Sequence, residues 1–64
     1  MKLLNFVRAG QLQQKLAVKV EVIAYVEQTY TDDWSRVHFI GGGSVEVAGS
    51  FEYVLSLLEE ASQS

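Results

Sequence analysis

The chain has 64 residues, 48% of them hydrophobic, and its 5 basic and 8 acidic residues give a formal net charge of −3. It has no cysteine and one histidine, so disulfides and thiolate metal sites are excluded, and we expect no metal and no cofactor. The acidic balance argues against binding to duplex DNA, which depends on neutralising phosphates. The length indicates a single domain covering residues 1–64.

Stability is the first problem for so short a chain. A domain of this size buries only about 60% of the surface that its unfolded chain exposes. The apolar content, with three Phe, three Tyr and one Trp, is more than a small domain can easily bury. Without disulfides or metals, association of several copies is the remaining common source of stability. We therefore expect a homo-oligomer.

We expect no export signal in the first residues of the sequence. Its first ten residues, MKLLNFVRAG, have an apolar run that is broken by Asn5 and Arg8 and lacks a cleavage site, unlike a signal peptide. No stretch approaches the roughly 20 apolar residues of a membrane span. The sequence predicts no membrane insertion and a cytoplasmic location.

The first half of the chain has the alternation of β-strands. Residues 2–8 predict a first strand, and the polar residues 11–15 predict a turn. Residues 16–30 are rich in β-branched residues and predict one strand or two short strands with a break, and their alternation slips after Val22. The slip predicts a bend or bulge near Glu21 to Ile23, or a strand covered on both faces.

Residues 31–35, TDDWS, have the composition of a loop. Trp34 is unexpected in a loop, because a turn needs no indole. Either it folds back over a sheet edge, as large partly buried aromatics do, or it offers a stacking surface at an interface.

Three consecutive glycines, Gly41, Gly42 and Gly43, separate two further strands. Side chains alternate between the faces of a strand, so Phe39 and Val45 share the core face only if the loop has an odd number of residues. We predict a three-residue loop, where glycine has no steric penalty. A phosphate-binding loop is the alternative, although a single short glycine run is weak support for one.

This register has consequences for charge. It pairs Arg36 with Ala48 and His38 with Glu46, on the face opposite the core. A solvated or interfacial pair of His38 and Glu46 is favoured over a catalytic base, because no nucleophile or metal accompanies it.

The C-terminal residues predict a helix that Ser50 caps, with Glu52 in its first turn. Its buried face has helical spacing and consists of Phe51, Val54, Leu55, Leu58 and Ala61. Tyr53 and Leu57 form a second apolar pair beside this face, which we assign to a subunit contact. Together the segments predict an α+β fold, a small curved antiparallel sheet of four to five strands followed by one C-terminal α-helix.

Several segments resemble the small FlbD-like proteins, also called SwrD, and their relatives in phages and mobile elements. The matching positions are Ile23, Val26, Glu27, the glycine turn, and Ser50, Phe51, Glu52 and Val54. The chain departs from the family pattern at Lys19, Val20 and Glu21, where a turn is usual, and in the longer loop around Trp34. The resemblance implies a flagellar, regulatory or accessory role in the cytoplasm of a bacterium, or of its host if a phage encodes the protein.

No catalytic motif emerges, so we predict a protein that is not an enzyme. The first hypothesis is a protein-interaction module that binds itself and an unknown protein partner. The alternative is a phage anti-defence protein that sequesters a small anionic nucleotide signal between subunits. Its ligand residues would be Lys19, Tyr25, Tyr30, Trp34, Arg36, His38, Gly41, Gly42 and Gly43. A third hypothesis is binding of single-stranded nucleic acid by exposed aromatics.

Overall fold

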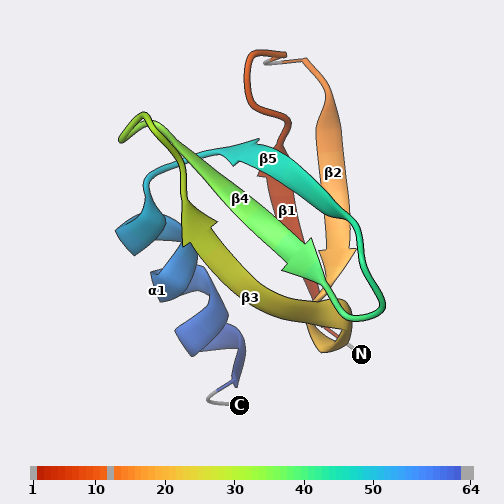
Figure 1. Cartoon of the computed structure of the whole chain (residues 1–64). Helices are drawn as coiled ribbons and strands as arrows, with labels where there is room; N and C mark the ends of the chain where they lie inside the picture. The colour runs from red at the N-terminus through yellow and green to blue at the C-terminus, as the bar shows by residue number, and fades with distance from the viewer. Residues whose placement is uncertain (1, 12, 63–64) are drawn as a thin grey trace.

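The computed structural model describes residues 2–11 and 13–62. Over these residues, five antiparallel strands form two small sheets and a single helix follows them (Figure 1). The α+β fold predicted from the sequence is therefore confirmed. The elements are β1 (Leu3–Val7), β2 (Lys15–Lys19), β3 (Ile23–Gln28), β4 (Trp34–Phe39), β5 (Ser44–Ala48) and α1 (Phe51–Ser62).

A sharp bend carries the chain from the first sheet, β1–β2, into the second, β3–β4–β5. Here the 3₁₀ helix Val20–Val22 connects β2 to β3. The Ile40 N–H donates a hydrogen bond of 2.8 Å to the carbonyl of Val22. The register of β3 on β4 also shifts between Ile23 and Tyr25. The bend predicted near Glu21 to Ile23 is confirmed, because the alternation slips where the chain leaves one sheet for the other.

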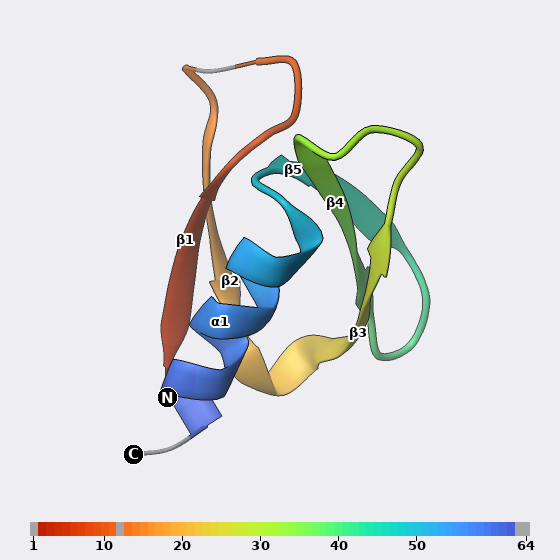
Figure 2. The same cartoon turned by 90° about the vertical axis from the view of Figure 1, so that its left-hand side faces the viewer.

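The two sheets meet again at their other ends and enclose the core. Arg8 forms a bridge with Val47, and the Ala9 N–H donates to the carbonyl of Glu46 at 3.0 Å. Helix α1 lies beside β1 and β3 and covers the side that the sheets leave open (Figure 2). The buried hydrophobic residues are Phe6, Val18, Val37, Val47 and Val54.

The hairpin loop between β4 and β5 is displaced from its predicted position. His38 pairs with Ser44, and the Phe39 N–H donates a hydrogen bond of 3.1 Å to the carbonyl of Gly43, so the loop holds residues 40–42. The prediction of Gly41 to Gly43 as the loop is wrong because the Gly42 N–H donates to the carbonyl of Phe39 and closes the turn one residue earlier. The loop length is still odd, so Val37 lies opposite Val45 and the core faces agree. All three glycines have positive φ, between 90° and 109°, which favours glycine.

The start of the helix agrees with the sequence, whereas the position of Trp34 does not. Ser50 Oγ accepts a hydrogen bond of 3.1 Å from the Tyr53 N–H, which confirms the N-cap. Trp34 was predicted in a loop, but it begins β4 and pairs with Ala48. The half-buried indole lies edge-on to the Tyr30 ring, with centroids 6.5 Å apart. The prediction failed because the polar residues 31–33 before Trp34 have the composition of a loop, which hid the start of the strand.

Candidate functional site

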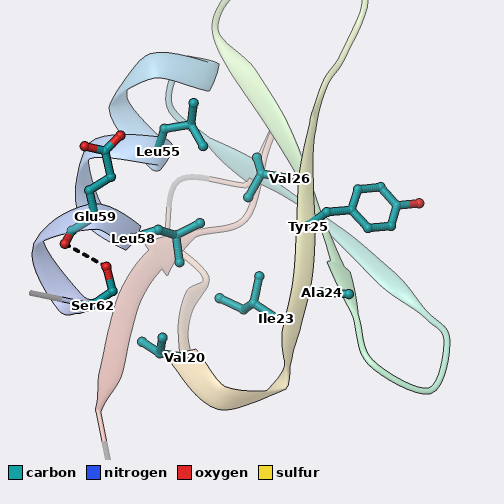
Figure 3. Close-up of a pocket in the computed structure, with 9 residues that line it drawn as sticks. All are labelled: Val20, Ile23, Ala24, Tyr25, Val26, Leu55, Leu58, Glu59 and Ser62. Carbon is teal, nitrogen blue, oxygen red and sulfur yellow. Dashed lines mark hydrogen bonds between the residues drawn. The ribbon is translucent and has the colours of Figure 1, made fainter.

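An apolar groove of about 350 Å³ runs between β3 and α1 (Figure 3). In this view Ile23 and Val26 point from β3 toward the helix, whereas the Tyr25 ring points away from it. The lining residues are Val20, Ile23, Ala24, Tyr25, Val26, Leu55, Leu58, Glu59 and Ser62. Aliphatic side chains form the floor, so the groove suits an apolar occupant.

The helix side of the groove follows from residue spacing. Leu55, Leu58 and Ser62 are three and four residues apart, so they form one stripe along α1. Val54, one position before Leu55, is fully buried in the core. The stripe is thus the margin of the core-facing side, and it stays half-covered because no further strand lies beyond β3 in the sheet that the structure describes.

The β3 side of the groove is a free strand edge. Among the described strands β3 pairs only with β4, on one side. Its sequence, IAYVEQ, contains neither lysine nor proline, the residues with which natural proteins discourage pairing at sheet edges. Its one charged residue, Glu27, already contacts His38 and Arg36. The backbone edge of β3 is therefore suited to contact with another chain.

A ladder of paired charges crosses the outer face of the second sheet. His38 Nε2 is 2.8 Å from Glu27 Oε1, and the His38 ring stacks on Tyr25 with centroids 4.2 Å apart. Arg36 Nη2 is 2.6 Å from Glu46 Oε2, and its Nη1 is 3.7 Å from Glu27 Oε1. The hydrogen bond and charge of Glu46 raise the pKa of Arg36 above its usual value. Arg36 and His38 are therefore already paired with the carboxylates of Glu27 and Glu46, which weakens the attraction of this face for an anionic ligand.

The predicted ligand residues do not form one site. Tyr25, Arg36 and His38 lie together on the outer face, opposite Val37, as expected. Lys19 lies on β2 in the other sheet. Tyr30 lies in the loop between β3 and β4, Trp34 begins β4, and Gly41, Gly42 and Gly43 follow the other end of β4 (Figure 1).

The predicted pairing of His38 with Glu46 is wrong. The displaced loop moves the register by two residues, so Glu46 lies opposite Arg36. His38 instead contacts Glu27 on β3. The sequence offered no way to find this partner, because the bulge between Ile23 and Tyr25 sets the register of β3.

The predicted subunit contact on the helix has two different environments. Leu57 packs against the core, while Tyr53 is 53% exposed. The Tyr53 ring lies over Gly49, where an added Cβ would approach ring carbon Cδ2 to 2.7 Å. The assignment of Tyr53 and Leu57 to a subunit contact stays a prediction.

Reasoning from the sequence missed Arg8. This residue follows β1 and lines a polar pocket where the chain reaches β5. Its Nε is buried and has no hydrogen-bond partner among the described residues. A usable signal was present, because Arg8 continues the alternation of Leu4 and Phe6 and so places a charge at the end of an apolar strand.

A scan against protein-family models, a search of curated proteins and a search of solved structures each found no match. The resemblance to FlbD-like proteins therefore stays a prediction. In the described part of the chain, no helix is long and apolar enough to cross a membrane. Residues 2–11 and 13–62 also contain no group of three or more His, Cys, Asp or Glu side chains placed to hold a metal ion.

Proposed function

We propose that the chain is a non-enzymatic protein-interaction module that acts as a homo-oligomer. In the oligomer, a second copy lies along the free edge of β3 and over the groove between β3 and α1. The observation that carries this proposal is an apolar groove directly beside an unpaired edge strand. The resemblance to FlbD-like proteins supports a regulatory or accessory role in a bacterium or phage.

A second copy is the occupant that the surface favours. An antiparallel strand edge is self-complementary about a two-fold axis, so β3 can lie against β3 of another copy. The core of the described residues consists of five buried hydrophobic side chains. Tyr25 is 56% exposed and Val22 is 40% exposed, both beside or within β3. Burying them would add the apolar contact that the core of one copy lacks.

The size of a stable interface determines how much surface must take part. A standard interface buries about 800 Å² on each partner, and the chain exposes 4357 Å² in total. The groove alone is too small to supply this area. The contact must therefore extend over the outer side of β3, including Tyr25, and along the exposed side of α1.

The test compares the mass of the wild type with that of three lysine variants by sedimentation equilibrium at micromolar concentration. Ala24→Lys places a charge on an exposed residue that lines the groove. Gln13→Lys makes the same charge change in the exposed turn between β1 and β2. Tyr53→Lys changes the exposed aromatic on α1 that does not line the groove.

The wild type and Gln13→Lys should sediment as oligomers, and Ala24→Lys should sediment as a folded monomer with an unchanged far-ultraviolet circular dichroism spectrum. If Tyr53→Lys dissociates the oligomer and Ala24→Lys does not, the interface lies on the Tyr53 side of α1. A wild type that is monomeric at every concentration would refute the homo-oligomer.

A further inference from the structure

A second, polar pocket of about 470 Å³ lies where the chain leaving β1 meets β5. It is lined by Arg8, Ala9, Arg36, Ser44, Val45 and Glu46. The bridge of Arg8 to Val47 brings Arg8, which follows β1, to the same pocket as Arg36 of β4. This pocket shares no lining residue with the groove between β3 and α1.

The charges of the pocket do not balance. Glu46 is its one carboxylate, and it is hydrogen-bonded to Arg36 at 2.6 Å. Arg8 has no ion pair among the described residues, and its buried Nε has no hydrogen-bond acceptor. The lining residues thus carry one positive charge in excess, which belongs to Arg8.

A buried donor without a partner is costly, and the cost is larger for a charged group. A guanidinium presents its N–H groups as a planar fork that matches two oxygens of a carboxylate or phosphate. An oxyanion in this pocket would accept hydrogen bonds from the guanidinium of Arg8, through its terminal nitrogens while the Nε stays enclosed. The hydroxyl of Ser44, which also lines the pocket, is a further potential donor.

We propose that this pocket binds an oxyanion with a single negative charge, shared by two oxygens that accept hydrogen bonds from Arg8. A carboxylate and a phosphodiester both have this chemistry. A dianion brings one charge more than the excess on the pocket, and Glu46 repels it. The site binds monoanions more tightly than dianions for this reason.

The test follows the Arg8 Nε–Hε signal of the full ¹⁵N-labelled chain by NMR. The chain has two arginines, Arg8 and Arg36, so the assignment follows from the signal that disappears in Arg8→Gln. The probes are acetate for a carboxylate, dimethyl phosphate for a phosphodiester and sulfate for a dianion, all at one ionic strength set with sodium chloride. Lys19→Gln is the matched control, because it removes one positive charge from an exposed residue outside the pocket.

The Arg8 signal should shift along a saturating curve with acetate, dimethyl phosphate or both, in the millimolar range, in the wild type and in Lys19→Gln. The probe that saturates at lower concentration identifies the ligand as a carboxylate or a phosphodiester. The Ala9 and Ser44 amide signals should follow the same curve and lose this response in Arg8→Gln. Linear drift without saturation, or sulfate binding as tightly as the monoanions, would overturn the proposal.

Glu46→Gln supplies a second arm of the test. It removes the one carboxylate among the lining residues and leaves Arg8 and Arg36, with Glu27 3.7 Å from Arg36 Nη1 outside the lining. The preference for acetate over sulfate should then weaken, because Glu46 no longer repels the second charge of the dianion. An unchanged ratio of the two affinities would contradict the charge argument.

Discussion

Gly49 is the position where a single methyl group should have the largest local effect. Its φ is 127°, and an added Cβ would meet ring carbon Cδ2 of Tyr53 at 2.7 Å. A non-glycine residue in this backbone region costs about 1–3 kcal/mol, and displacing the ring from its rotamer costs about 0.5–1.5 kcal/mol more. Alanine also restricts the unfolded chain, which offsets about 0.4–1 kcal/mol. Gly49→Ala should therefore destabilise the fold by about 2 kcal/mol.

Two further variants separate backbone strain from the clash. Gly42 has φ 109° and no atom within 4 Å of an added Cβ, so Gly42→Ala carries the strain alone and should cost about 1 kcal/mol. Tyr53→Ala removes the ring, so Gly49→Ala made in that background should cost about 1 kcal/mol less than in the wild type. The free energies come from urea unfolding at one protein concentration, followed by the fluorescence of Trp34.

The expected change is large for this chain, since 64 residues correspond to a total stability on the order of 3–10 kcal/mol. The reasoning is refuted if Gly49→Ala unfolds at the wild-type urea concentration. A change of equal size with and without the Tyr53 ring would show that the ring does not lie over Gly49.

Three other substitutions test the fold. Ser50→Ala removes the acceptor of the Tyr53 N–H and should cost about 1 kcal/mol in thermal unfolding; an unchanged melting temperature would contradict the cap. Val37→Ala leaves a cavity at a fully buried position and should cost about 2 kcal/mol in urea; a cost below about 0.5 kcal/mol, the range of surface substitutions, would place Val37 outside the core. Deletion of Gly42 makes the hairpin loop even-numbered, so it turns Val45 and Val47 away from the core and should abolish the cooperative unfolding transition; a wild-type transition would refute the register.

The elements that the sequence could predict are those set by local periodicity. The slip after Val22 marked the bend, and Ser50 marked the start of α1, because both signals depend only on neighbouring residues. The odd loop length also followed from alternation, but alternation cannot distinguish a loop of residues 41–43 from one of residues 40–42. The hydrogen bonds of Phe39 with Gly42 and Gly43 select the second.

The candidate sites depend on contacts between distant segments, and the sequence predicted less of them. The partner of His38 depends on the bulge in β3, and the groove depends on where α1 packs beside that strand. Val54 and Leu58 were correctly placed on the core-facing side of the helix, but periodicity does not indicate that β3 leaves that side partly uncovered. Arg8 and Arg36 line the same pocket only because the two sheets meet at the end of β1.

Hydrogen–deuterium exchange measured over a range of protein concentrations tests the central claim most directly, because it locates the contact between copies on the strand itself. Amides of β3 whose N–H groups point away from β4 should exchange more slowly as the concentration rises. Amides of β4, which pairs on both sides within one copy, should not change. Exchange in β3 that is fast and independent of concentration would contradict the proposal that a second copy covers this edge.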